Sequence, residues 1–341
     1  MPETRTRRAF APGRVNLIGE HTDYTGGLVL PVALELGITV EVTTGGGRIV
    51  GVSAGHQSAE LPALAGGSDL AAVEPAWIRF LVAAARRIGV VDGFTATVSS
   101  DLPVGGTGLS SSSALTCAAV LAMGAEGTVI ELARLARLAE IDATGVEIGI
   151  MDQAVSMGGV ADHALLIDCR TLDITPVPVP SSIEVLVVHT GQSRDLAGSA
   201  YRRRLDECRR IEQAIGPLRD AGQDAIAELD DPVLARRARH VITENERVRR
   251  MIDALAAADG PAAGKVLLEG HRSLRTDYEV STPIVDDLVA TVAGTTGVYG
   301  ARLTGGGFGG SLVALCEPGT EVALDTWWTR ARPGVGAHLL A

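Results

Sequence analysis

The sequence predicts an α+β protein of two domains. At 341 residues the chain is longer than the roughly 150 residues of one common domain, so two domains are expected. Stretches that read as strands and stretches that read as helices follow one another without the strict alternation of a doubly wound sheet. Three prolines lie within residues 175–182, and this turn-rich segment is taken as the boundary between domains 1–180 and 181–341.

Strands are predicted where short apolar runs, rich in β-branched residues, lie between turn formers. Three such runs occupy residues 28–42, 161–168 and 183–189. The triplet Gly45-Gly46-Gly47 follows the first of them and indicates a plain turn. Strands are therefore expected in both domains.

Helices are predicted for three longer stretches, which are residues 113–123, 129–143 and 199–215. Thr128 directly precedes the second stretch. Glu131 lies three residues after Thr128, which is the spacing of a capping box. Such a pair satisfies two backbone N–H groups that a helix leaves unpaired at its start, so a helix is expected to begin at residue 129.

Charge and hydropathy exclude several classes of partner. The formal charge is -11, and nucleic acids and anionic membranes both attract basic proteins, so neither is expected. No apolar run approaches the ~20 residues of a membrane helix, and Pro12-Gly13-Arg14 interrupts the N-terminus before a signal peptide could form. The four cysteines include no CxxC pair, which favours free thiols. A cytoplasmic protein, monomeric or weakly self-associating, is expected.

A phosphate site in this chain is not expected to be a lysine-containing P-loop. Lys265 is the only lysine among 30 basic residues. Its surroundings are one residue short of a Walker A loop, and Val266 stands where a Ser or Thr would bind Mg²⁺. Backbone N–H groups, hydroxyls and arginines are therefore the groups expected to bind phosphate.

The segment 102–114 is a glycine-rich turn that runs through four serines into an apolar helix. Glycine allows a ligand to approach the backbone closely, and the first helical turn presents unpaired N–H groups and the positive end of its dipole. This pattern is typical of an anion site. A Ser/Gly turn with an ordinary N-cap explains the same residues, and the segment alone does not decide between the two.

Five polar side chains lie close together near the N-terminus, next to an apolar strand and framed by glycines. They are Arg14, Asn16, Glu20, His21 and Asp23. Carboxylates and imidazole exchange hydrogen bonds with sugar hydroxyls and strongly reject analogues that lack those hydroxyls. The segment therefore predicts a polyhydroxylated ligand, although His21 taken singly is more often an ordinary surface or core histidine.

Three of these motifs together resemble one enzyme superfamily. Residues 13–27 resemble the galactokinase signature, residues 106–114 the ATP loop of the GHMP kinases, and residues 302–310 the third motif of that superfamily. Other stretches resemble galactokinase segments in the right order, so the resemblance covers nearly the whole chain. These stretches are residues 149–153, 163–170, 196–201, 239–245 and 277–283. The resemblance implies the two-domain GHMP kinase fold, with an N-terminal domain like domain 2 of ribosomal protein S5, a ferredoxin-like C-terminal domain and the active site between them.

The resemblance also implies a role for each matching residue. It implies that Asp152 is the catalytic base, that Arg14 stabilises charge beside it, and that Mg²⁺ is held by Ser112 and Glu140. The implied sugar contacts are Glu20, His21, Thr22, Asp23, Gly149 and Tyr201. The implied contacts to the ATP phosphates are Gly106, Thr107, Gly108, Leu109, Ser110, Ser111 and Ser112. The implied reaction is transfer of phosphate from Mg-ATP to the anomeric hydroxyl of D-galactose.

Each of these residues also has a structural interpretation. Asp152 taken alone is one of 41 acidic residues and would most often be a solvated or capping carboxylate. Glu140 falls near a predicted helix end, Tyr201 could stack on a neighbouring arginine, and Gly305–Gly310 could be a hairpin. Their joint occurrence in family order favours the functional interpretation.

The chain departs from the galactokinase pattern at a few places. It is short, little sequence precedes the first motif, and Thr107 is an extra residue in the glycine loop. Residues 189–195 and positions 25 and 28 also differ from the usual pattern, so sugar identity is more open than catalysis. A related sugar 1-kinase for arabinose, a hexosamine or a uronic acid is therefore the nearest alternative.

Two other classes of protein fit the sequence less well. A non-catalytic sensor of sugar and ATP is disfavoured because the serine cluster and Asp152 are intact. A dinucleotide-binding oxidoreductase is disfavoured because the loop at Gly105 lacks the acidic residue and the βαβ spacing of that fingerprint.

Overall fold

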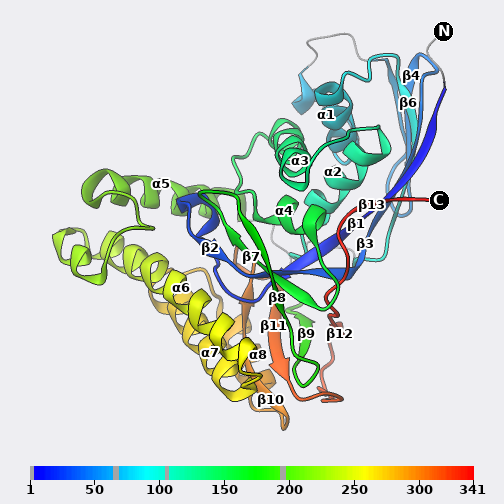
Figure 1. The fold of residues 1–341 in the computed structure, drawn as a ribbon. Coiled ribbons are helices and arrows are strands. Elements are labelled where there is room, and N and C mark those ends of the chain that lie inside the picture. Colours follow the sequence, from blue (N-terminus) through cyan, green and yellow to red (C-terminus); the bar gives the residue numbers. More distant parts are fainter. Residues whose placement is uncertain (1–3, 64–68, 104–106, 193–196) are drawn as a thin grey trace.

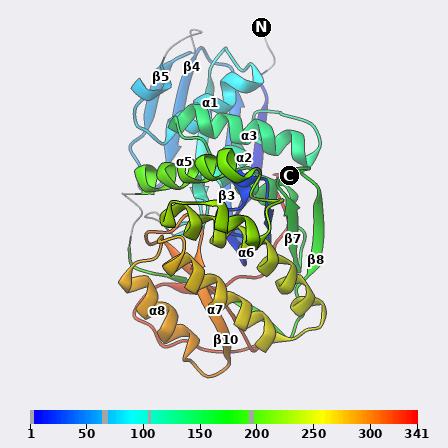
Figure 2. The same ribbon diagram turned by 90° about the vertical axis from the view of Figure 1, so that its left-hand side faces the viewer.

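The computed structural model describes residues 4–63, 69–103, 107–192 and 197–341. Figure 1 shows two halves, one above the other, each with helices packed on one face of a sheet. In the view of Figure 2 the helices of both halves lie on the same side of the molecule. The α+β class is confirmed. Apart from β4 (Arg48–Ser53) with β6 (Phe94–Ser100), the strand pairs within the described residues run antiparallel.

The first half is built on a six-stranded sheet. Besides β4 and β6, its strands are β1 (Thr6–Asn16), β3 (Pro31–Thr44), β5 (Ala59–Pro62) and β13 (His338–Leu340), in the order β13-β1-β3-β6-β4-β5. The helices that pack against this sheet and one another are α1 (Ile78–Ile88), α2 (Ser111–Ala122), α3 (Val129–Thr144) and α4 (Met151–Gly158). Short 3₁₀ turns lie at Asp23–Thr25 and Leu70–Ala72. The main apolar core lies between the sheet and these helices and continues into the second half, where residues such as Val187, Met251 and Leu267 join it.

The second half is built on a four-stranded sheet. Its strands are β9 (Glu184–His189), β10 (Val298–Thr304), β11 (Ser311–Cys316) and β12 (Trp328–Arg330), in the order β10-β11-β9-β12. Its helices are α5 (Ala197–Ile215), α6 (Pro232–Ala256), α7 (Gly260–Thr276) and α8 (Pro283–Ala293), with a 3₁₀ segment at Gln223–Glu228. A smaller sheet of β2 (Leu28–Val29), β7 (His163–Asp168) and β8 (Ile174–Pro178) lies between the halves in Figure 1. A second apolar core lies under α5 to α8.

The predicted helices are present with small shifts at their ends. The helix predicted from residue 129 begins at Val129, and Thr128 and Glu131 form the expected capping box. The strand predicted at 28–42 is divided, because the chain leaves the small sheet after Val29 and enters the large sheet at Pro31. No local sequence signal separates two strands that pair with different partners.

The prediction that residues 175–182 form a turn-rich domain boundary is wrong in part. This segment contains most of β8, which pairs with β7 at the edge of the small sheet. Prolines are tolerated there because an edge strand need not donate every backbone hydrogen bond. The division into domains 1–180 and 181–341 stays a prediction, and β13 departs from it because it pairs with β1 in the first half.

No helix within the described ranges combines the length and the apolar character that spanning a bilayer requires.

Candidate active site

Arg14 and Asp152 form a two-pronged ion pair where the halves meet, in which Arg14 is buried and Asp152 is partly exposed. The Nε atom of Arg14 donates to Oδ1 of Asp152 at 2.8 Å, and its Nη2 atom donates to Oδ2 at 2.7 Å. Arg14 is 4% exposed and follows an irregularity in β1, where such bulges re-aim side chains. Asp152 lies in the first turn of α4. Two parallel charge-assisted hydrogen bonds fix both the position and the orientation of the carboxylate.

The serine-rich loop is tied to the same pair. Arg14 also donates from Nη1 to the carbonyl oxygen of Gly108 at 2.8 Å, and its backbone N–H donates to Leu109 at 3.1 Å. Ser110 precedes α2 with a φ of 58°, and its hydroxyl donates to Oδ2 of Asp152. The unpaired N–H groups that open α2 therefore lie close to the Asp152 carboxylate.

The Asp152 carboxylate lines a cavity of about 230 Å³, here called the first cavity. Its walls come from the 11–27 segment, the starts of α2 and α4, α3, α5 and the glycine-rich turn after β10. The lining residues are Arg14, Glu20, His21, Asp23, Ser113, Glu140, Val146, Ile148, Gly149, Met151, Asp152, Tyr201, Gly305 and Gly306. The cavity is thus rich in carboxylates that can accept hydrogen bonds from hydroxyl groups.

Asp23 and Gly149 meet at one wall of the first cavity. A Cβ atom built on Gly149 would lie 1.6 Å from Oδ2 of Asp23, so only glycine fits beside this carboxylate. Burial and, after it, the nearby Asp152 carboxylate raise the pKa of Asp23 to about 6. Both effects are expected where two carboxylates face one ligand.

His21 and Tyr201 belong to a small aromatic cluster beside the first cavity. The Nδ1 atom of His21 lies 2.9 Å from the hydroxyl of Tyr24, which lies 2.7 Å from the hydroxyl of Tyr278. The rings of His21 and Tyr201 are 5.9 Å apart. His21 has a φ of 63°, a strained backbone that the surrounding packing holds in place.

Thr22 is predicted to contact the ligand but does not line the first cavity. Its hydroxyl lies 2.8 Å from the carbonyl oxygen of Gly19 and 2.7 Å from that of Leu28, and the residue is fully buried. Thr22 therefore holds the ends of its own loop together through its hydroxyl, and its contact with the sugar stays a prediction.

Glu140 reaches the first cavity from α3 although it is only 6% exposed. Its Oε2 atom accepts hydrogen bonds from Ser113 at 2.8 Å and from Gln153 at 2.7 Å. Burial raises the pKa of Glu140, and hydrogen bonds from Ser112 and Ser113 oppose that rise.

A hard cation fits the groups around Glu140. Within the described parts of the chain, no cluster of three or more His, Cys, Asp or Glu side chains suits a metal ion. Mg²⁺, however, is commonly bound by one or two carboxylates together with substrate phosphates and water. Glu140 and the Ser112 hydroxyl are oxygen ligands of that kind.

A second cavity, of about 500 Å³, opens beside the start of α2. It is lined by Ile38, Ser53, Ala54, His56, Trp77, Phe80, Val98, Ser100, Leu102, Pro103, Ser111, Ser112 and Leu115. Ser111 and Ser112 line this cavity, whereas the next residue, Ser113, lines the first. The first turn of α2 thus has the two cavities on its two sides, which places its unpaired N–H groups between them.

Sequence reasoning found most of the first cavity but only Ser111 and Ser112 of the second. The predicted residues Arg14, Glu20, His21, Asp23, Glu140, Gly149, Asp152 and Tyr201 all line the first cavity. Gly305 and Gly306, in the third motif, were not assigned a contact. Trp77 and Phe80 carry no local motif that would reveal them. The predicted residue Gly106 lies outside the described residues.

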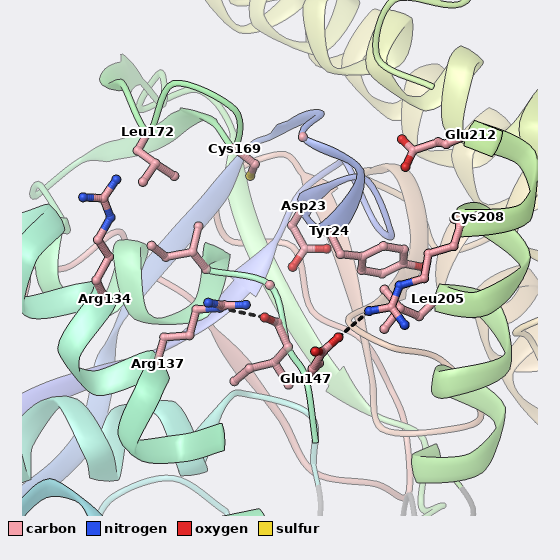
Figure 3. Close-up of a pocket in the computed structure, with 15 residues that line it drawn as sticks. Asp23, Tyr24, Arg134, Arg137, Glu147, Cys169, Leu172, Leu205, Cys208 and Glu212 are labelled. Carbon is pink, nitrogen blue, oxygen red and sulfur yellow. Dashed lines mark hydrogen bonds and ion pairs between the residues drawn. The ribbon is translucent and has the colours of Figure 1, made fainter. Parts of the chain in front are cut away.

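A third cavity, of about 460 Å³, shares Asp23, Ile148 and Gly149 with the first (Figure 3). Arg137 of α3 donates to the carbonyl oxygen of Ile148 at 2.7 Å, and Arg209 of α5 pairs with Glu147. The segment that divides the two cavities is therefore held by arginines from both halves.

Three protein-family models match this chain. They are the galactokinase galactose-binding signature over residues 3–44, the GHMP kinases N terminal domain over residues 77–159, and the GHMP kinases C terminal domain over residues 251–324. The matched ranges include Arg14 and Glu20 in the first and Asp152 in the second.

Several curated proteins named galactokinase are similar over most of their length. The chain is 44% identical to one from Roseiflexus sp. (strain RS-1), over 90% of this chain and 82% of the relative. It is 40% identical to one from Homo sapiens, over 90% and 83%. It is 36% identical to one from Thermotoga neapolitana, over 92% and 90%.

Solved structures share the fold. A Lactococcus lactis galactokinase complexed with galactose matches with a TM-score of 0.87 and 28% identity, over 98% of this chain and 95% of the other. The Methanococcus jannaschii mevalonate kinase matches with a TM-score of 0.71 over 98% and 99%, and at 18% identity it speaks for the fold alone.

Proposed function

Because this chain belongs to the galactokinase family of the GHMP kinases, we propose that it transfers the γ-phosphoryl group of ATP to the anomeric hydroxyl of D-galactose. The transfer takes place in the first cavity, with Arg14 and Asp152 as the side chains that act on the reacting groups. One observation carries the assignment of residues. The Arg14–Asp152 pair and the hydroxyl of Ser110 meet at the start of α2, with one cavity on each side of that helix turn.

Phosphoryl transfer needs alignment and charge stabilisation more than covalent help. Asp152 accepts the proton of the attacking hydroxyl or orients it, because its carboxylate is fixed by Arg14 and Ser110. The guanidinium of Arg14 and the N–H groups of α2 stabilise the negative charge that develops on the phosphoryl oxygens. Water is partly excluded because Arg14, Glu20 and Glu140 are almost completely buried.

The second cavity suits the nucleoside of ATP. Trp77, Phe80 and Leu115 offer apolar surface to a purine, and Ser111 and Ser112 offer hydroxyls where the phosphates would begin. The indole N–H of Trp77 donates to the carbonyl oxygen of Gln57 at 3.0 Å, which fixes the ring.

Trp77→Ala is expected to raise the KM for ATP about tenfold or more and to leave the KM for galactose within about twofold, because a stacked aromatic ring contributes on the order of 1 to 3 kcal/mol. Steady-state kinetics with each substrate varied in turn measures both constants. Equal changes in the KM values for ATP and galactose, or no change in either, would contradict binding of the nucleoside in this cavity.

Ser112 and Glu140 are proposed to hold Mg²⁺, which when bound neutralises charge on the nucleotide phosphates. Glu140→Ala is expected to shift the half-saturating Mg²⁺ concentration upward by about tenfold or more, because the carboxylate is the charged ligand of the set. A Mg²⁺ titration at fixed ATP measures this shift. Glu131→Ala, at the exposed capping box of the same helix, is the control and should leave the titration unchanged.

A panel of sugars tests the acceptor. With ADP release as the readout, galactose is expected to exceed arabinose, a hexosamine and a uronic acid in kcat/KM. The uronic acid should be the poorest, because its carboxylate would meet Glu20, Asp23 and Asp152. Preference for any of the three over galactose would overturn the choice of sugar, and absence of ADP release with all four would overturn the kinase assignment.

A further inference from the structure

Arg302 is the largest side chain that is fully buried within the described residues. It belongs to β10, two residues before Thr304 and the glycine-rich turn. Its Nη1 atom donates to Oε1 of Glu244 at 2.8 Å, and its Nη2 atom donates to Oε2 of Glu20. Gly270 in α7 leaves room for the guanidinium, since a Cβ atom there would lie 3.1 Å from Nη1.

Glu20 receives hydrogen bonds on both carboxylate oxygens. Its Oε1 atom accepts from the backbone N–H of Gly305 at 2.9 Å and lies 3.3 Å from the hydroxyl of Thr304. Its Oε2 atom accepts from Arg302. Glu20 therefore connects the first motif to the glycine-rich turn that lines the first cavity with it.

Arg302 also forms an ion pair with a second carboxylate, that of Glu244. Glu244, on α6, is fully buried and accepts at Oε1 from the backbone N–H of Gly19 at 3.0 Å as well as from Arg302. Its Oε2 atom accepts from Arg247 at 2.6 Å. The two carboxylates and two guanidiniums balance in charge and join α6, β10 and the loop before Glu20.

Such a network is a costly way to gain stability alone. Buried ion pairs often stabilise a protein no better than apolar residues of the same size, while removal of one partner is strongly destabilising. What this network does fix is the position of one carboxylate at the wall of the first cavity. The side chain of Glu20 is 1% exposed, so little of it is open to a ligand.

An ionised carboxylate has about four acceptor positions. Gly305 occupies one of those on Oε1 of Glu20, and Arg302 occupies one of the two on Oε2. The Thr304 hydroxyl also faces Oε1 at 3.3 Å, but its one proton lies nearer to the carbonyl oxygen of Asn16, at 3.0 Å. Burial raises the pKa of Glu20 to about 7 and the charge of Arg302 opposes this rise, so the carboxylate is ionised at pH 8.

We propose that Arg302 is a positioning residue for the acceptor: by fixing the carboxylate of Glu20 it directs the remaining acceptor capacity of that carboxylate at one hydroxyl of the sugar in the first cavity, and it thereby selects for that hydroxyl. This inference rests on the proposed function, because it concerns the same cavity. Arg302 itself does not line the cavity, so its effect on the sugar passes through Glu20.

The test compares galactose with its 2-, 3-, 4- and 6-deoxy forms at pH 8, using kcat/KM ratios from ADP release. In the wild type, loss of the hydroxyl that bonds to Glu20 should lower kcat/KM on the order of 10²-fold, since an unpaired buried charge costs about 2 to 3 kcal/mol. Glu20→Gln identifies that hydroxyl, because in this variant only the kcat/KM ratio of galactose to the form that lacks that hydroxyl should fall toward 1.

Arg302→Lys should change the same ratio. A lysine ammonium is a single point charge and cannot bridge two carboxylates in the way that the guanidinium fork does. We expect the ratio at that hydroxyl to fall at least tenfold toward 1 and the KM for galactose to rise, while the other three ratios and the KM for ATP stay within about twofold.

Arg237→Lys is the matched control. Arg237 is 2% exposed and pairs with Glu207 and Glu279 in the second half, without lining the first cavity. It should lower the Tm and leave all four ratios unchanged. If Arg302→Lys fails to fold, Glu244→Gln replaces it, because loss of that charge lets Arg302 move toward Glu20 and should change the same single ratio.

Two results would overturn the inference. A folded Arg302 variant, or Glu244→Gln in its place, with all four ratios unchanged would show a purely structural role. Four ratios that change equally would show a general distortion of the cavity. If the wild type prefers another monosaccharide, the deoxy forms of that sugar are used. If the galactose assignment is wrong, the wild type will prefer another sugar. If this inference is wrong, the four kcat/KM ratios of the Arg302 variant will be unchanged or will all change equally.

Discussion

Asp152→Asn is expected to lower kcat by about 10²- to 10⁴-fold, the range that a positioned general base contributes. The amide cannot take the proton of the anomeric hydroxyl, and its NH₂ group cannot accept the hydrogen bonds that Arg14 and Ser110 donate to the two carboxylate oxygens. The side chain keeps its size, so the fold and ATP binding should persist. Steady-state ADP release measures kcat, and thermal melting and calorimetric ATP titration measure the other two.

The chain offers a matched control for this change. Asp142, near the end of α3, accepts two hydrogen bonds from Arg87 at 2.6 and 2.7 Å, the same two-pronged arrangement outside the three cavities. Asp142→Asn should leave kcat within about twofold. Turnover of Asp152→Asn within tenfold of the wild type would mean that Asp152 is neither base nor essential orienter.

Arg14→Lys is expected to lower kcat on the order of 10²- to 10³-fold, the loss typical of removing one charge-stabilising donor from an active site. Arg14 donates to three acceptors at once, the two oxygens of Asp152 and the carbonyl oxygen of Gly108. A lysine keeps the charge but cannot reach all three, so Asp152 loses its fixed orientation and the serine loop loses an anchor.

The same change should also lower the free energy of unfolding by about 1 to 3 kcal/mol, because hydrogen bonds to charged groups contribute about that much and the partly exposed Asp152 carboxylate or the Gly108 carbonyl loses its donor. Urea unfolding measures this loss separately from kcat. Arg87→Lys, at the exposed pair with Asp142, should change neither quantity by much, since exposed ion pairs contribute little. An Arg14→Lys enzyme with unchanged kcat would exclude Arg14 from the reaction.

Local signals in the sequence were sufficient for the parts of the fold that depend on neighbouring residues. The start of α3 was predicted from Thr128 and Glu131 because a capping box is complete within four residues. The strand β9 was predicted nearly to its ends because an apolar run between turn formers is equally local.

Pairing between distant segments could not be predicted in this way. The division of residues 28–42 into β2 and β3 follows from partners more than 100 residues away in one case and from β1 in the other. The return of β13 to β1 joins the two ends of the chain. Neither choice is encoded in the composition of the strands themselves.

The same distinction applies to the candidate site, where residues in motifs could be predicted and their contacts with distant residues could not. Arg14, Glu20 and Asp152 were found because they stand in motifs that resemble a known family. The contacts that fix them come from elsewhere, such as Ser110 at Asp152 and Arg302 at Glu20. Thr22 shows the converse, since a residue inside a ligand-binding motif can serve the loop itself.

The most direct test of the central claim is a crystal structure of the protein with galactose and a non-hydrolysable ATP analogue. We predict the anomeric oxygen of galactose within about 2.6 to 3.2 Å of an Asp152 carboxylate oxygen, with the terminal phosphate at the start of α2. A nucleotide bound away from Ser111 and Ser112, or an anomeric oxygen out of hydrogen-bond reach of Asp152, would contradict the account.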